Sequence, residues 1–586
     1  EVNEVAVGLA NHAQANISDL TVREAGVGVQ SQAGSLNLTG LGLINASVGV
    51  ATVTGADSTI SSVTGSGLAL AIDASNTDGF SFGQAQLSGH RLMVAQGASS
   101  LLLDDVEFTG TSTENRAVAD INCDGTCTLV DTSLESTQYG VALSGAGTHA
   151  LEGLEVSATA QGLQATGAGH VVLRNASVTA NDHALSIQTP TSSLSSVNVS
   201  TTTSQGIGVD VLGGVHVWDD VVMSKPFLSS DRDSIGLNMW YADVTVEHLT
   251  VRNYSTAAML EDSMADVATL EANIGSVAGV HLIESSYAGQ SLTTVAQDEG
   301  VVMEGTSSLH LSAWTAQLHD TPLMMSSGSE AIVRSFSPVN TAPTSSDALG
   351  DGTLYYGSSS NPSISTTTSY RLLETDVTFT DLQGAPVEAD VHVHGFKLTS
   401  NSNGALTLPL VGAGSLVDVT LEGAGVRVVL YGGQTGQSVQ VPVIPQGDWT
   451  INAGQDVVLG PRPDGQPHQL TGDLTISNNA VLTLQSTTLS VPQTNSVTLQ
   501  GSGVLQGTSA LLDAPAVQAS GTSMLSGMAD GVLTVQANVQ WGCLSERSVE
   551  SLVVAGDLTV QPGCDVQLSN GSVTGDVVAQ TGATFT

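Results

Sequence analysis

The sequence predicts an all-β protein built mainly from a right-handed parallel β-helix, a solenoid in which each turn of the chain stacks on the turn before it. Three observations predict this fold: a repeat of about 22 residues, alternation of apolar and polar residues inside each repeat, and turn-forming residues between the alternating stretches. The repeat is clearest between Thr148 and Val199.

Two phrases recur in step within this stretch. The first is Leu151 to Val156, which returns as Leu173 to Val178 and Leu194 to Val199, so its starts are offset by 173 − 151 = 22 and 194 − 173 = 21. The second phrase begins at Gly140, Gly162, His183 and Gly206, with offsets of 22, 21 and 23. A fixed period in this range is typical of stacked-repeat proteins.

The phrases also indicate strands. They alternate over four to six positions, which is the period of a half-buried strand, and Gly, Ser, Thr and Asn fill the gaps. One coil cannot bury its inward side chains alone, so we expect coils to stack about 4.8 Å apart by parallel hydrogen bonding. Copies of the phrases extend in both directions and place this solenoid at residues 1–340, with about 15 coils.

The pattern then changes twice. Residues 341–369 are rich in Ser, Thr, Pro and Gly and are predicted to be a linker or surface loop. Residues 370–446 alternate strictly between turn signals and predict a small β-sandwich. Residues 447–586 return to a solenoid, because Gly472 to Leu484 matches Gly556 to Leu568 at an offset of 556 − 472 = 84, four periods of 21.

The sandwich region resembles the carboxypeptidase-regulatory-like, transthyretin-like domains. The resemblance rests on Thr380 to Val387, the alternating stretch Ala389 to His394, and Thr399 to Leu408 around Asn403-Gly404. It covers only the segment 370–446, and its motif is loose. In that family the module is usually a non-catalytic spacer in surface proteins, which is what the resemblance implies here.

Composition limits the partners. The net charge is −42, so nucleic acid and anionic membrane surfaces are expected to be repelled. There is no run of about 18 apolar residues, so no membrane span is predicted. The coil pattern at both ends also predicts self-assembly, head-to-tail or in a lattice, in which another copy continues the stack past Gly575. The rival explanation is a single longer polypeptide of which this chain is one part.

The four cysteines form two self-consistent pairs. Cys543 and Cys564 are offset by 564 − 543 = 21, one coil period, and Cys123 and Cys127 lie four apart in a Gly-containing turn. Both spacings are compatible with disulfides, and paired cysteines indicate an oxidising, extracellular or cell-surface location. The alternative is two stacks of buried free thiols.

Seven N-x-S/T sequons are candidate glycosylation sites, although several arise by chance in a chain this rich in Asn, Ser and Thr. They are Asn16, Asn37, Asn45, Asn175, Asn198, Asn253 and Asn570.

Long β-helices of this kind resemble the pectin-lyase-like superfamily, which contains polysaccharide lyases and polygalacturonase-type hydrolases. Asn76 to Phe80 looks like the N-T-D-G motif of those hydrolases, and Asp104 and Asp105 follow downstream. The resemblance therefore implies Asp78, Asp104 and Asp105 as catalytic candidates, but the family motifs G-H-G and R-I-K are missing. Asp104-Asp105 also fills a slot that holds other turn residues in neighbouring repeats, so a turn role is the competing interpretation.

One stretch has the spacing of a calcium-binding loop. Asp120, Asn122 and Asp124 alternate before Gly125, and Asp131 follows. Hard oxygen ligands at alternate positions around a glycine bend suit Ca²⁺, whereas a disulfide-closed turn explains the same residues. We expect no required cofactor and keep Ca²⁺ as the alternative.

Two classes of function follow. The first is an extracellular structural or adhesive surface protein that self-assembles into a layer, sheath or filament and is not an enzyme. The second is a polysaccharide-active enzyme or carbohydrate-binding protein, for which glycans would be the partner. The outward-facing residues of one sheet should discriminate them: an acidic and aromatic groove favours the second class, and a surface of Ser, Thr and Asn favours the first.

Overall fold

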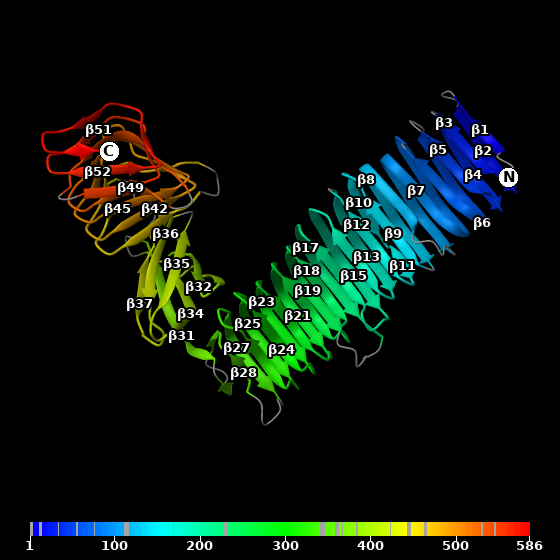
Figure 1. Cartoon of the computed structure of the whole chain (residues 1–586), viewed down its shortest axis with the longest axis horizontal. Coiled ribbons are helices and arrows are strands. Elements are labelled where there is room, and N and C mark those ends of the chain that lie inside the picture. Colours follow the sequence, from blue (N-terminus) through cyan, green and yellow to red (C-terminus); the bar gives the residue numbers. More distant parts are fainter. Residues whose placement is uncertain are drawn as a thin grey trace. The chain divides into compact units, whose positions relative to one another are not determined.

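The computed structural model describes the chain from residue 4 to 586, except 11–13, 33, 54–56, 76, 111–115, 137, 168, 227–232, 340–345, 358–361, 366, 382–384, 422–423, 442–446, 462–465, 529–530 and 544–545. The described residues form strands and no helix, which confirms the all-β prediction. The chain divides into two compact units, Glu1–Tyr370 and Arg371–Thr586. Stacked strands are visible in both (Figure 1).

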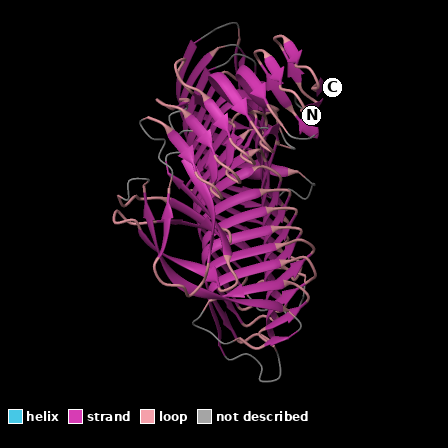
Figure 2. Ribbon diagram, turned by 90° about the vertical axis from the view of Figure 1, so that its left-hand side faces the viewer, coloured by secondary structure: helices cyan, strands magenta, loops and turns pink. Residues whose placement is uncertain are grey.

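Each coil of the first unit contains three short extended segments. In one coil, β13 (His170–Ala180) is divided by Asn175, whose φ of 49° turns the chain, and β14 (His183–Gln188) follows. β13 pairs in parallel with β15 (Thr191–Thr201) of the next coil. Repetition of this arrangement produces parallel ladders that run from coil to coil (Figure 2), so the predicted parallel β-solenoid is confirmed.

The first phrase was aligned correctly from sequence, and the second was not. Leu151, Leu173, Leu194 and Trp218 follow one another in a single ladder, as the first phrase predicts. The other ladder pairs Leu163 with Leu185 and Leu185 with Val209. The second phrase therefore restarts at Ala184 and Gly208, one and two positions later than His183 and Gly206, because buried side chains fix the register and glycines do not.

The solenoid continues into the segment predicted as a linker. Within 341–369, β28 (Ala348–Gly350), β29 (Thr353–Tyr356) and β30 (Ile364–Ser365) pair in parallel with preceding strands. Ala348 and Leu354 are completely buried in the solenoid core. The linker prediction is wrong there because these strands are too short to show alternation against Ser- and Thr-rich turns.

A column of serines supplies hydrogen-bond partners to backbone groups at one corner of the solenoid. The Ser285 hydroxyl accepts a hydrogen bond from the backbone N–H of Ser263 in the preceding coil at 3.0 Å and donates to the Ile283 carbonyl in its own coil at 2.7 Å. The Ser263 hydroxyl likewise accepts from the Ala242 N–H and donates to the Glu261 carbonyl. The Ser307 hydroxyl accepts from the Ser285 N–H and donates to the Glu304 carbonyl. Each hydroxyl thus pairs two buried backbone groups that the turn leaves without ladder partners.

The second unit begins with the sandwich. Its core contains Val377, Phe379, Val391, Leu408 and Val419. One sheet contains β31 (Thr368–Thr380), β34 (Ala405–Val411) and β37 (Gln437–Gln440), and the facing sheet begins with β33 (Phe396–Thr399), β32 (Asp390–Val393), β35 (Ser415–Leu421) and β36 (Ala424–Leu430).

The facing sheet continues into the second solenoid. β36 pairs antiparallel with β39 (Asp456–Leu459), and β39 then pairs in parallel with β42 (Val481–Gln485) of the next coil. A sandwich strand therefore covers the edge that the first coil would otherwise present to water. Arg427, opposite Asp456, is held by Asp418 through Nη2–Oδ2 at 3.0 Å.

The later coils confirm the offset of four periods. One ladder contains Leu474, Val497, Val517, Val539 and Leu558, so the offset 558 − 474 = 84 spans four coils.

Both predicted disulfides are confirmed. Cys543–Cys564 joins adjacent coils with Cα atoms 4.7 Å apart. Cys123–Cys127 joins two positions of β8 (Ala117–Ser136) with Cα atoms 6.2 Å apart.

The serine column yields a stability prediction. Replacing Ser285 by Ala removes the acceptor of the Ser263 N–H and the donor to Ile283, so we expect the free energy of unfolding to fall by about 1–3 kcal/mol. Denaturant titration measures it. The control, Ser177→Ala, changes an exposed serine that faces outward from β13 and should lower it by less than about 0.5 kcal/mol. Equal effects of the two substitutions would contradict the role of the column.

Candidate functional site

The catalytic candidates implied by the hydrolase resemblance do not come together. Asp78 is exposed and lies beside Ser99 of the next coil, whose N–H donates to the Thr77 carbonyl. Asp104 lies 104 − 99 = 5 positions further along that coil, which in an extended chain is roughly 16 Å. Inverting hydrolysis needs carboxyl groups about 6.5–9.5 Å apart. Asn76, which begins the motif, lies outside the described residues.

Asp105 occupies a turn. Its φ is 54°, and the residues at the same corner of the next three coils also have positive φ: Asp131 (44°), Gly153 (64°) and Asn175 (49°). Short polar residues and glycine tolerate this conformation, which explains the repeated Asp and Asn. Asp105 instead shares a shallow hollow of about 370 Å³ with Glu107, a residue that the motif did not suggest. The Glu107 carboxylate accepts a hydrogen bond from Gln86.

The calcium candidates have other partners. Asp120 pairs with Arg91, with Nη2–Oδ2 at 3.5 Å, and Asn122 Oδ1 accepts from the Gly97 N–H at 3.3 Å. Asp124 is exposed on the same extended strand, and Asp131 lies in the corner column. Across the described ranges, no group of three or more His, Cys, Asp and Glu side chains is placed to hold a metal ion. The spacing resembles a calcium loop, but Asp120 and Asn122 bind Arg91 and Gly97, and the bend around Asp124 is closed by the Cys123–Cys127 disulfide.

The sequons differ in accessibility. Six of the asparagines are exposed: Asn16, Asn37, Asn45, Asn175, Asn198 and Asn570. Asn253 is half-buried, and its amide nitrogen donates to the Lys225 carbonyl at 2.7 Å. Glycosylation there would replace this bond. Asn16 and Asn37 are ladder neighbours, about 4.8 Å apart, so glycans on both would crowd each other.

Sequence reasoning missed a buried group that has the partners of a catalytic dyad. His216 Nδ1 lies 2.9 Å from Ser192 Oγ, and its Nε2 lies 2.7 Å from the Gly213 carbonyl oxygen. Trp218 Nε1 also donates to Ser192 Oγ. Both Ser192 and His216 are buried in the core, so no substrate reaches them, and burial lowers the pKa of His216. The pair supports the fold, as does His319, which contacts the Thr294 and Gln297 carbonyls.

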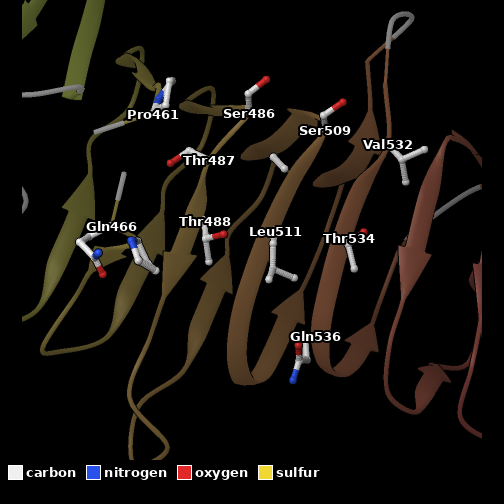
Figure 3. Close-up of a pocket in the computed structure, with 12 residues that line it drawn as sticks. Pro461, Gln466, Ser486, Thr487, Thr488, Ser509, Leu511, Val532, Thr534 and Gln536 are labelled. Atoms are coloured by element: carbon white, nitrogen blue, oxygen red, sulfur yellow. The ribbon is translucent and has the colours of Figure 1, made fainter. Parts of the chain in front are cut away.

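A concave surface lies on the second solenoid. It is a groove of about 600 Å³ that crosses four coils (Figure 3). Pro467, Thr488, Leu511 and Thr534 occupy equivalent ladder positions along it, one per coil. Ser486 and Ser509 line one side at positive φ.

The described residues that line this groove are neutral. Hydroxyl and amide groups come from Gln466, Thr488, Thr534 and Gln536, and apolar surface comes from Pro461, Pro467, Leu511 and Val532. None of its described lining residues is ionisable, although the chain as a whole carries a charge of −42. Such a surface can form hydrogen bonds with a neutral polar ligand, and none of the described lining residues supplies a general acid or base.

No protein family, curated protein or solved structure matches this chain. Within the described part of the chain, no helix is long and apolar enough to span a membrane.

The buried histidines predict an acid-sensitive fold. Burial lowers the pKa of His149, His216 and His319 below the value of about 6.5 expected in the unfolded chain. Below pH 6.5 the unfolded state therefore binds more protons, and stability falls as the pH decreases. The loss is at most about 1.4 kcal/mol per pH unit for each histidine that stays neutral.

Denaturant titration at several pH values measures this effect. His216→Gln should make the decline between pH 7 and pH 5 shallower, whereas His248→Gln, at an exposed position, should leave it unchanged. A decline as steep in His216→Gln as in the parent protein would show that His216 does not contribute.

Proposed function

We propose that this chain is an extracellular structural or adhesive surface protein that self-assembles and is not an enzyme. The observation that carries the proposal is the composition of one outward-facing ladder of the first solenoid. Ser, Thr, Asn or Gln occupies ten of its fifteen positions, and no aromatic residue occurs in it. The ladder consists of Thr21, Gly42, Thr64, Gln86, Glu107, Ser133, Glu155, Ser177, Asn198, Val222, Thr250, Glu271, Thr293, Thr315 and Ser337.

A ladder of this composition favours a surface over an active site. Its three glutamates, Glu107, Glu155 and Glu271, are separated by several coils or by Ser133. Glu107 shares a shallow hollow with Asp105, but Asp105 is the corner residue two positions before it in the same coil, and Glu107 accepts a hydrogen bond from Gln86. Hydrolysis of a glycosidic bond needs two convergent carboxyl groups, and polysaccharide lyases need a base together with a cation. Neutral hydroxyls and amides interact with water and with other polar surfaces without such chemistry.

The cysteines support the extracellular part of the proposal. All four cysteines lie in the described chain, and all four are paired. Structural disulfides form and persist in oxidising compartments, whereas cytosolic thiols are kept reduced. The exposed sequons are compatible with the same location.

The uncharged groove favours a second candidate, a carbohydrate-binding protein. Its rows of Thr and Gln next to Pro467 and Leu511 match a neutral sugar chain, which has hydroxyls at its edges and apolar faces. This candidate predicts binding without cleavage.

A panel of neutral and acidic polysaccharides distinguishes these functions. We expect no release of reducing or unsaturated sugar ends, because the candidate acids Asp78 and Asp104 lie too far apart to act on one bond. Cleavage that is lost in Asp78→Asn would contradict the proposal. Binding of a neutral glycan without cleavage, lost in Leu511→Glu and retained in Val217→Glu on the first solenoid, would favour the second candidate.

Self-assembly is tested separately. Every coil presents a full ladder of backbone donors and acceptors to its neighbour, so coils of different copies can stack by the same hydrogen bonds. We expect sedimentation velocity and electron microscopy to show ordered oligomers that grow with protein concentration. A chain that stays monomeric at high concentration, with and without Ca²⁺, would refute this part of the proposal.

A further inference from the structure

Six large apolar side chains are exposed together at one corner of the first solenoid. They are Leu212, Val215, Val217, Trp240, Tyr241 and Met264, with exposed fractions between 38% and 64%. Leu212 ends β16 (Ile207–Leu212) and pairs with Trp240, which ends β18 (Ile235–Trp240) in the next coil. Val215 and Met264 lie two coils apart in one ladder, with Asp243 between them. We call these six residues the apolar patch.

Most equivalent positions in the adjacent coils are polar, so the repeat itself does not require the patch. In the preceding coil, Gln188 lies near Leu212, Thr191 pairs with Val215, and Ser193 pairs with Val217. In the coil after β17 (Val215–Ser224), Val217 pairs with Thr245. Val215 and Val217 thus stand between Thr, Ser and Asp in the adjacent coils, and as outward residues they gain no burial in the core.

Tyr241 provides an independent sign that the patch has a role outside the fold. Its φ is 53°, a conformation that is unfavourable for a bulky residue, and its side chain is 64% exposed. Gly213, Asp262, Glu284 and Gly305 have positive φ at this corner in neighbouring coils. A glycine or short polar residue would fold with less strain, and an unusual backbone conformation of this kind often marks a functional position.

Carboxylates border the patch. Glu261 is the ladder neighbour of Trp240, and Asp243 pairs with both Val215 and Met264. Asp262 follows Glu261 at the same corner as Tyr241. No Lys or Arg occupies a ladder position next to any of the six patch residues within the described strands.

We propose that the apolar patch is a docking surface for a short protein segment that carries arginine or lysine together with apolar side chains. Arg and Lys have apolar stems and cationic ends, so the stems can pack on Val215, Val217 and Met264. The ends then reach Asp243, Glu261 and Asp262, and a guanidinium can also stack on Trp240 or Tyr241. This inference goes beyond the proposed function and does not depend on it.

Charge and size argue against other occupants. A second copy supplies few cations for these carboxylates, because the chain has only 13 Lys and Arg among its 586 residues. Six side chains form a smaller surface than the roughly 800 Å² per partner of a standard interface, which suits a short segment better than a whole domain. A neutral glycan could stack on the two aromatic rings, but it would leave the bordering carboxylates without a charge partner.

Tryptophan fluorescence of the intact chain can report binding. Trp240 is 38% exposed, whereas Trp218, Trp314, Trp449 and Trp541 are buried, so a ligand at the patch changes mainly the emission of Trp240. The probes are three short synthetic peptides of Leu, Gly and a third residue that is Arg, Gln or Glu. We expect the Arg peptide to shift the emission to shorter wavelength and to bind about tenfold or more tightly than the Gln peptide. The Glu peptide should not bind.

Two variants test the location. Tyr241→Gly keeps the turn conformation and should weaken binding of the Arg peptide about tenfold. Its matched control is Leu318→Gly, which also removes an exposed apolar side chain at positive φ (55% exposed, φ 61°) but at another corner. Leu318→Gly should bind as the parent protein does. The double variant Glu261→Gln, Asp262→Asn should abolish the preference for the Arg peptide over the Gln peptide.

Three results would overturn the proposal. The first is equal binding of the Arg and Gln peptides, or binding of neither. The second is a change in Trp240 emission with a neutral oligosaccharide such as cellohexaose but not with the Arg peptide. The third is a self-association equilibrium that Tyr241→Gly disrupts while Arg-peptide binding is unaffected, because the patch would then bind a second copy.

Discussion

The parallel hydrogen-bonded ladder between coils is the constraint on which the rest of this structure depends. It fixes a spacing of about 4.8 Å and places each residue above its counterpart one coil earlier. Inward columns such as Leu151, Leu173 and Leu194 are therefore mostly apolar, and inward polar residues such as Ser192 and His216 are hydrogen-bonded to each other. The corners must return the chain at the same place each time, so residues at positive φ recur there, and the serine column supplies partners to backbone groups that the turns leave unpaired.

The same constraint produces patterns that look like functional motifs. A corner that favours Asp, Asn or Gly in every coil generates sequences such as Asp104-Asp105, and alternation places Asp120, Asn122 and Asp124 on the outward side of one strand. A repeated structural demand thus explains the motifs without convergent chemistry. In a regular solenoid, the informative residues are those that depart from their own column, such as Val215 and Tyr241, because neighbouring coils serve as internal controls.

The second unit shows how the ladder can begin. A parallel coil cannot pair its first edge with itself, and an open edge invites unwanted pairing. Here β36 of the sandwich supplies an antiparallel partner to β39, and the sheet then continues in parallel through the later coils. The sandwich, interpreted from sequence as a spacer, is therefore also the structural start of the second solenoid, with Arg427 bound to Asp418 at the junction.

Periodicity by itself determined the solenoid, the four-coil offset between Leu474 and Leu558, and the disulfide across one coil, because these depend only on spacing along the chain. Periodicity could not determine the register of the second repeated phrase, which was recognised by its glycines. His183 and Gly206 therefore do not lie in the ladder position of Gly162, which Ala184 and Gly208 occupy. Periodicity also missed the short strands between Ala348 and Ser365, whose alternation was too brief to detect. Only the tertiary structure decided that Asp78 and Asp104 are far apart, that Ser192 and His216 are buried, and that the apolar patch gathers from three coils. Those facts depend on which side chains different coils place next to each other and which they cover, and spacing along the chain does not contain that information.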